Sequence, residues 1–127
     1  MSQGDSAPRR ILVVEDEPEV ADVERNILAM EGFAVDTARD GTEALERLAA
    51  TRYHAIVLDA HLPGMDGYEV AARVRALALN RDTPIVMVTA SQAPDARQRG
   101  FDLGIVGFVS KPFQPATFRA LMANLAR

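Results

Sequence analysis

Apolar residues gather in five short runs along the chain, separated by longer stretches in which apolar positions recur at helical spacing. The runs are rich in branched side chains and cover residues 11–14, 33–35, 55–58, 85–88 and 105–109. Most are apolar without interruption, which is typical of strands covered on both faces in a parallel sheet. The pattern therefore predicts five strands with a helix after each.

The helical stretches carry start and stop signals of their own. The first has Pro18 in its first turn, Gly32 as its stop, and an apolar stripe of Val20, Val23, Ile27 and Met30. The second and third each open on an aspartate followed three residues later by a glutamate, the form of a capping box, at Asp40/Glu43 and Asp66/Glu69. For this reason Asp66 is interpreted as a helix cap and not as a site residue.

The last two helices differ in strength. Residues 94–103 predict the weakest helix, because Gly100 costs about 1 kcal/mol relative to alanine. The helix after Pro115 has a regular buried stripe of Phe118, Leu121, Met122 and Leu125. We expect Met30 and Met122 to fill the core, and no linker or effector domain to follow the last helix.

Strands that alternate with helices predict right-handed parallel crossovers and hence an α/β fold. We expect a flavodoxin-like, doubly wound, five-stranded parallel sheet of order 2-1-3-4-5 with five helices. Ligands of such sheets bind beyond the carboxyl ends of the strands, where the strand order reverses. In this order, that crevice lies between the first and third strands.

Composition restricts the class of protein. A length of 127 residues, with 48% hydrophobic and 25% charged residues, suits one globular domain. We expect this domain to cover residues 10–127, after a disordered tail at 1–9. No signal peptide and no apolar run of about 20 residues is present, so a cytoplasmic location without membrane insertion is expected. A net charge of −4 argues against a nucleic-acid surface, and the absence of cysteine fits a reducing compartment.

Polar residues stand directly after four of the predicted strands. Glu15 and Asp16 follow the first, Asp59 the third, Thr89 the fourth and Lys111 the fifth. Each alone has an ordinary explanation as a cap, turn or surface residue, so the argument depends on their convergence. Three adjacent carboxylates repel one another unless a cation neutralises them, and their hard oxygen atoms suit Mg²⁺. The pattern predicts a divalent-metal site.

The segments ILVVEDEP, VLDAHLPGMDGYE, PIVMVTA and FVSKPF closely resemble, in order and spacing, the receiver domains of response regulators in two-component signalling. The resemblance implies that Asp59 takes a phosphoryl group from a phosphohistidine. It also implies that Asp16, Asp59 and the backbone carbonyl of His61 hold Mg²⁺ (or Mn²⁺), with Glu15 acting directly or through water. Lys111, with the metal, would supply positive charge to the phosphoryl group, and the Lys111–Pro112 bond resembles one that the family holds cis.

In the same family, a threonine and an aromatic residue move together on phosphorylation, which implies a switch at Thr89 and Phe108. Phe108 departs from members that carry tyrosine there, so it lacks a hydroxyl for an outward hydrogen bond. Gly100 is expected to lower the cost of rearranging the fourth helix. His61 and Ser91 are expected to modulate the phosphoryl lifetime, although an exposed and inert His61 is the alternative.

The main hypothesis is a phosphorylatable switch, and not an enzyme with turnover of a separate substrate. Its expected partners are a histidine kinase or phosphotransfer protein and a downstream protein, reached through the fourth helix, fifth strand and fifth helix. We expect a monomer without nucleic-acid binding. The alternatives are a pseudo-receiver that binds partners without phosphorylation, and a small phosphatase with an aspartyl nucleophile. Kinase, pathway and target stay open, as does the choice between a free-standing regulator and a piece of a hybrid kinase.

Overall fold

A computed structural model describes residues 8–90, 98, 100–111 and 114–125. All neighbouring strands of its five-stranded sheet run parallel, in the order β2-β1-β3-β4-β5. The strands are β1 (Arg10–Val14), β2 (Ala34–Ala38), β3 (Ala55–Asp59), β4 (Ile85–Thr89) and β5 (Ile105–Ser110). The sheet order and the doubly wound class predicted from the sequence are confirmed.

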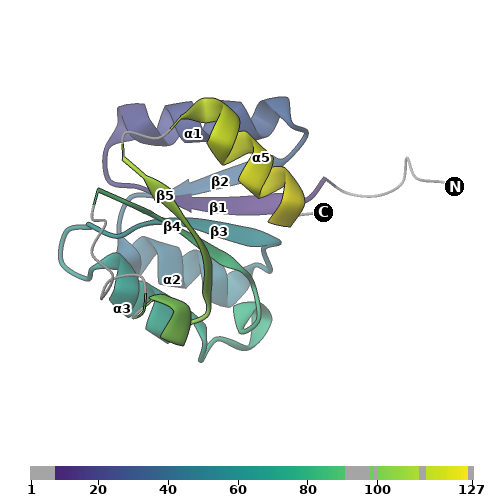
Figure 1. The fold of residues 1–127 in the computed structure, drawn as a ribbon. Helices are drawn as coiled ribbons and strands as arrows, with labels where there is room; N and C mark the ends of the chain where they lie inside the picture. The colour runs from purple at the N-terminus through teal and green to yellow at the C-terminus, as the bar shows by residue number, and fades with distance from the viewer. Residues whose placement is uncertain (1–7, 91–97, 99, 112–113, 126–127) are drawn as a thin grey trace, which may run out of the picture.

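Helices cover both faces of this sheet (Figure 1). The described elements are α1 (Pro18–Met30), α2 (Gly41–Ala50), α3 (Gly67–Val74), the short 3₁₀ turn η2 (Ala78–Asn80) and α5 (Pro115–Leu125). α1 and α5 lie on one face, and α2 and α3 lie on the other. Residues 98 and 100–102 are helical, within the segment predicted as the fourth helix. None of the described helices has the length and apolarity of a membrane span.

Each face of the sheet has its own apolar layer. Under α2 and α3 the layer includes Leu12, Ile56, Leu58 and Met87, all fully buried. Under α1 and α5 it contains the alternate strand residues with Leu28, Phe118 and Met122. Because successive strand side chains point to opposite faces, a strand between two helical layers has no polar face. This accounts for the uninterrupted apolar runs.

The helix signals read from the sequence are confirmed. Asp40 and Asp66 each cap a helix, accepting hydrogen bonds from the backbone N–H of Glu43 at 2.8 Å and of Glu69 at 2.9 Å. After α1, Gly32 has φ +92°, a conformation that favours glycine and ends the helix.

The predicted buried face of α1 was wrong. Met30 is 77% exposed and Val23 is 47% exposed, while Ala21, Glu24 and Leu28 are the buried residues of this helix. A carboxylate therefore occupies a position that helical spacing gives to the core. The prediction counted only apolar residues, so it placed the buried stripe on a different face of the helix from Glu24. Met30 is therefore not a core residue.

The second strand was also misplaced, since it covers Ala34–Ala38 and not residues 33–35. It lies at the edge of the sheet, where polar residues are tolerated, and all its residues but Ala38 are only half-buried. Asp36 accepts hydrogen bonds there from the Tyr53 hydroxyl at 2.7 Å and from the Arg10 guanidinium at 3.3 Å. These partners offset the cost of a polar strand residue.

Gly67, the first residue of α3, lies against the end of β3. A Cβ atom at this position would lie 2.9 Å from Cα of Ala60 and closer still to the carbonyl oxygen of Asp59. These neighbours are backbone atoms, so no side chain can rotate away to make room. The missing side chain of Gly67 lets α3 pack directly behind Asp59.

We predict that Gly67→Ala lowers the free energy of unfolding by about 1–3 kcal/mol, the usual cost of overpacking. Gly107→Ala is the matched control, because a Cβ there would meet Leu121 at 3.4 Å, an ordinary contact. Urea unfolding of both variants checks the prediction. Equal free energies of unfolding for the two variants would contradict the prediction, because the backbone of Asp59 and Ala60 would then shift at no cost to accommodate the added methyl group.

Candidate functional site

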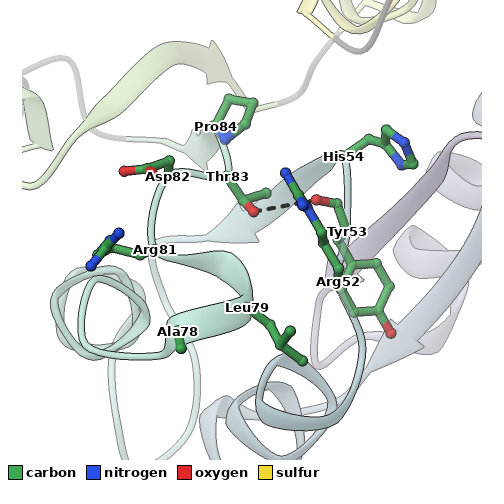
Figure 2. A pocket seen from close by; sticks show the side chains of 9 residues that line it. All are labelled: Arg52, Tyr53, His54, Ala78, Leu79, Arg81, Asp82, Thr83 and Pro84. Carbon is green, nitrogen blue, oxygen red and sulfur yellow. Dashed lines mark hydrogen bonds between the residues drawn. The ribbon is translucent and has the colours of Figure 1, made fainter.

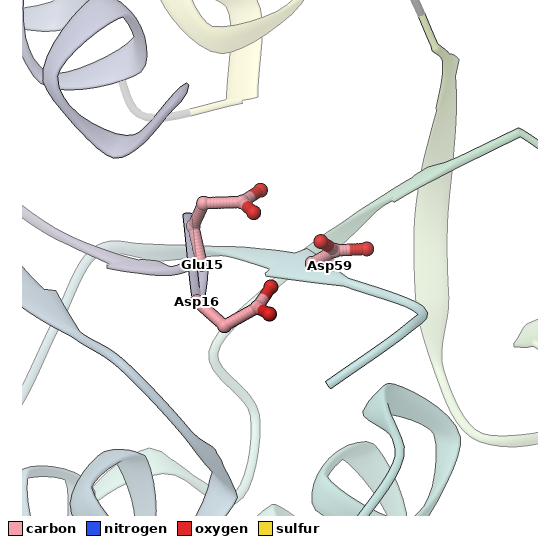
Figure 3. A group of neighbouring side chains, drawn as sticks. All are labelled: Glu15, Asp16 and Asp59. Atoms are coloured by element: carbon pink, nitrogen blue, oxygen red, sulfur yellow. The ribbon is translucent and has the colours of Figure 1, made fainter. Parts of the chain in front are cut away.

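The polar residues that follow the strands converge at the carboxyl end of the sheet. Glu15 and Asp16 follow β1, and Asp59 is the last residue of β3, directly beside β1. Figure 3 shows the carboxyl groups of Glu15 and Asp16 leaving the chain in different directions, with both turned toward Asp59. One oxygen or more of each carboxylate lies within 4.8 Å of the others.

Asp59 is 2% exposed, and both of its carboxylate oxygens have donors. Lys111 Nζ lies 2.7 Å from Oδ2, and the backbone N–H of His61 donates to Oδ1 at 2.9 Å. The first contact joins the ends of β3 and β5 across β4, and the second fixes the loop after β3. Asp59 is therefore held in one orientation by a cation and a backbone dipole.

Lys111 directly follows β5, and its side chain is a quarter exposed. Burial alone lowers its pKa, but the hydrogen bond and charge of Asp59, with the charges of Glu15 and Glu17, outweigh burial and raise it. The ammonium group is thus held charged beside the acids.

Glu15 is nearly as buried as Asp59, at 2% exposed. Its Oε2 accepts a hydrogen bond from the backbone N–H of Glu17 at 3.2 Å. Its Oε1 is buried without a hydrogen bond in the described part of the chain, with Lys111 Nζ 3.8 Å away. Burial, followed by the charge of Asp59, raises the pKa of Glu15 from 4.5 to about 7.

This group of acids fits a divalent cation. An unsatisfied, buried carboxylate oxygen on Glu15 and a raised pKa are what crowded acids show when positive charge is missing. All three donors are hard oxygens, which suit Mg²⁺ or Mn²⁺. Asp16 is exposed, so the group opens to solvent on its side. Glu15, Asp16 and Asp59 could hold such an ion.

A family model described as "response regulator receiver domain" matches residues 11–123. The chain belongs to this family. Receiver domains are phosphorylatable switches of two-component signalling, and they interact with histidine kinases and downstream targets.

Individual relatives agree with this family. The chain is 42% identical over 118 residues to the transcriptional regulatory protein TcrA of Mycobacterium tuberculosis, an alignment that covers 93% of this chain and 46% of TcrA. The receiver domain thus spans about half the length of the curated relatives it matches.

Solved structures of receiver proteins have the same fold. The chemotaxis protein CheY4 of Vibrio cholerae superposes with a TM-score of 0.89 at 32% identity, covering 94% of this chain and 99% of CheY4. The receiver domain of the sensor histidine kinase PA1611 of Pseudomonas aeruginosa superposes with a TM-score of 0.85 at 31% identity, covering 94% and 98%. That structure has a magnesium ion coordinated in its active-site cleft.

The residues expected to form the switch lie beside the acids and on β5. Thr89 is 3% exposed at the end of β4, and its carbonyl accepts a hydrogen bond from Lys111 N–H at 3.0 Å. The Phe108 ring is partly buried and meets the Phe101 ring edge-on, with centroids 5.6 Å apart. It also lies so close to Gly100 that a Cβ on this residue would collide with it. Gly100 therefore has a packing role beyond the flexibility we expected.

Of the two residues expected to modulate phosphoryl lifetime, His61 and Ser91, only His61 is among the described residues. The His61 side chain is exposed, and its backbone N–H, not its ring, contacts Asp59. Ser91 lies outside the described residues, as does Pro112, so their predicted roles stay predictions.

Glu24 was missed in the sequence because it stands alone in the middle of a helix, without a motif. It is 1% exposed, and neither carboxylate oxygen has a hydrogen-bond partner in the described chain. Burial, followed by the charges of Glu15 and Asp59, raises its pKa from 4.5 to about 8. The signal available was a charged residue at the spacing of Ala21 and Leu28.

A pocket of about 430 Å³ lies at the opposite end of the sheet (Figure 2). Its walls are residues 52–54, before β3, and residues 78, 79 and 81–84, before β4. Asn80 joins the two walls, accepting from Tyr53 N–H at 2.9 Å. This pocket lies at the amino ends of β3 and β4, far from the acids at the carboxyl ends of the strands, so it has no part in their chemistry.

The raised pKa values predict how stability depends on pH in the metal-free protein. Folded Glu15 and Glu24 bind protons more tightly than they do unfolded, with pKa values of about 7 and 8 against 4.5. Their contribution is complete below pH 4.5 and is lost as the pH rises through these folded values. The free energy of unfolding should therefore fall, by a few kcal/mol in order of magnitude, between about pH 5 and pH 8.

Urea unfolding in the presence of a chelator checks this decline. Glu24→Gln should remove much of it, whereas Glu46→Gln, a change at an exposed position of α2, should leave it as in the wild type. A wild-type profile parallel to that of Glu24→Gln would contradict the assignment.

Proposed function

We propose that this receiver domain is a switch whose phosphoryl acceptor is Asp59. The observation that carries the proposal is the 2.7 Å contact between Lys111 Nζ and the buried Asp59 carboxylate, within a group of three acids. A buried carboxylate so oriented, with a cation in place, is suited to nucleophilic attack on a phosphoryl group. Receivers bind phosphohistidine proteins, which are the proposed donors.

In the transfer step, a carboxylate oxygen of Asp59 forms a bond to phosphorus as the P–N bond of the donor's phosphohistidine breaks. The product is an acyl phosphate on Asp59, and the histidine leaves with the electron pair of the broken bond. Glu15, Asp16, Asp59 and the His61 carbonyl would hold Mg²⁺ or Mn²⁺, which supplies positive charge to the phosphoryl oxygens. Acetyl phosphate can replace the donor, with acetate as the leaving group.

Two side chains of the protein would bind the transferred group. Lys111, already charged and beside Asp59, is placed to pair with one phosphoryl oxygen. Thr89, at the end of the neighbouring strand, would donate its hydroxyl to another. Because negative charge spreads over the phosphoryl oxygens in the transition state, these fixed donors lower the barrier more than a general base would.

The same Thr89 contact would start the switch. Thr89 moving toward the phosphoryl group leaves space near the Phe108 ring, which packs on Phe101 and over Gly100. A change of the Phe108 rotamer would alter the surface of β5 and the preceding helix, where Phe101 is 55% and Val106 is 49% exposed. This surface, with α5, is the proposed output face for a downstream protein.

The proposed activity involves no turnover of a separate substrate, since Asp59 is both acceptor and product. Loss of the phosphoryl group occurs by hydrolysis of the acyl phosphate. What the switch controls depends on its partners, because the chain spans about half of its curated relatives.

We predict that acetyl phosphate adds the mass of one phosphoryl group to the protein, and that the gain requires Mg²⁺. Intact-mass spectrometry with and without chelator measures it. Asp59→Asn should abolish the gain, because an amide oxygen is a poor nucleophile.

Asp66→Asn is the matched control, since it makes the same change at the nearby cap of α3, where asparagine also caps well. It should be labelled like the wild type. No labelling of a folded wild-type protein with Mg²⁺ would favour a pseudo-receiver that works without phosphorylation.

The exposed ring of His61 should affect the phosphoryl lifetime. Its position two residues after Asp59 lets it steer or block the hydrolytic water. We predict that His61→Ala changes the dephosphorylation rate, which is measured by the loss of the phosphoryl mass with time. Equal rates for the two proteins would refute the role.

A further inference from the structure

The buried carboxyl group of Glu24 is the largest polar anomaly in the described part of the chain. It lies on the face of α1 between Ala21 and Leu28, and Leu28 belongs to the apolar layer of β1, β3 and α5. A carboxyl group buried without hydrogen bonds opposes folding, so its presence in a core position calls for an explanation in function. α1 also follows directly on the loop that carries Glu15 and Asp16.

Glu24 is shielded from solvent, at 1% exposed, and interacts electrostatically with the acids at the end of the sheet. The charged groups that act on it are Glu15, then Asp59, then Lys111, in order of size. Glu15, like Glu24, has an unsatisfied carboxylate oxygen, because its Oε1 is buried without a hydrogen bond. Two electrostatically interacting acids, Glu24 and Glu15, thus leave three buried carboxyl oxygens without hydrogen bonds in the described chain, two on Glu24 and one on Glu15.

We propose that Glu24 is a positioning residue of the phosphorylation site: its carboxyl group, through one bound water, hydrogen-bonds Oε1 of Glu15 and holds this carboxylate ready for the metal. The inference rests on the proposed function of the acids. No direct hydrogen bond joins the two residues, and polar groups beyond contact distance are commonly linked by a buried water.

The protonation of Glu24 suits this role. Burial, followed by the charges of Glu15 and Asp59, raises its pKa to about 8, which favours the neutral form, and a neutral carboxyl group can donate a hydrogen bond toward a negatively charged neighbour. A neutral group in this place adds no further charge to an already crowded set of acids. Groups behind a metal ligand orient it, and their loss commonly weakens metal binding by about 10-fold or more.

Two substitutions separate hydrogen bonding from packing. Glu24→Gln keeps size and a donor group, whereas Glu24→Leu keeps similar volume and removes every polar atom. For the metal-free proteins we expect a higher melting temperature in Glu24→Leu, because it removes an unsatisfied polar group from the core. For Mg²⁺ binding, measured by calorimetry near neutral pH, we expect Glu24→Leu to be weaker by about 10-fold and Glu24→Gln to stay within about twofold of the wild type.

Glu19→Leu is the control for the loss of an acid, because Glu19 lies exposed on the first turn of the same helix. It should bind Mg²⁺ like the wild type. Wild-type affinity in Glu24→Leu would overturn the proposal, and so would an equal loss in Glu24→Leu and Glu24→Gln, which would assign the effect to charge.

Labelling with acetyl phosphate distinguishes a failure of the proposed role of Glu24 from a failure of the proposed phosphoacceptor function. If the wild type is labelled on Asp59 but Glu24→Leu binds Mg²⁺ normally, only the role of Glu24 fails. If the wild type binds Mg²⁺ but is never labelled, the phosphoacceptor function fails, whatever Glu24 does.

Discussion

The site depends on the ion pair between Lys111 and Asp59. Parallel strands bring Glu15, Asp16 and Asp59 to one end of the sheet, within 4.8 Å of one another. Lys111, 2.7 Å from Asp59, is the cation of the described chain that reaches into this group. One positive charge does not neutralise three carboxylates, and burial, followed by the charges of neighbouring acids, raises the pKa of Glu15 and Glu24. A divalent cation would supply the missing positive charge.

The rest of the fold keeps Glu15, Asp16, Asp59 and Lys111 close together. Strand β4 lies between β3 and β5, so the distance from Asp59 to Lys111 is set by the sheet and not by a flexible loop. Gly67 lets α3 pack against the backbone of Asp59 and Ala60. The apolar layers on both faces supply the free energy that offsets burying the acids, since the three central strands β1, β3 and β4 are almost fully buried between them. Burying three acids so close together costs stability, and a bound divalent cation would reduce that cost.

Much of the fold could be predicted because its signals are local and repeated. Branched apolar runs marked the strands, and the aspartates at 40 and 66 marked two helix starts. The convergence of Asp59 and Lys111 followed from topology alone, since residues after parallel strands share one edge. The face of α1 could not be predicted, because Glu24 breaks the apolar pattern where the helix is most buried. The extent of β2 was missed because Asp36 relies on the distant partners Tyr53 and Arg10.

A crystal structure of the protein with Mg²⁺ and beryllium fluoride, a tetrahedral mimic of a phosphoryl group, tests the central claim most directly. We predict that the mimic binds a carboxylate oxygen of Asp59, with Lys111 and Thr89 contacting its fluorine atoms and the metal held by Glu15, Asp16 and Asp59. Metal bound among these acids with Asp59 left unmodified, or the mimic on another residue, would contradict it.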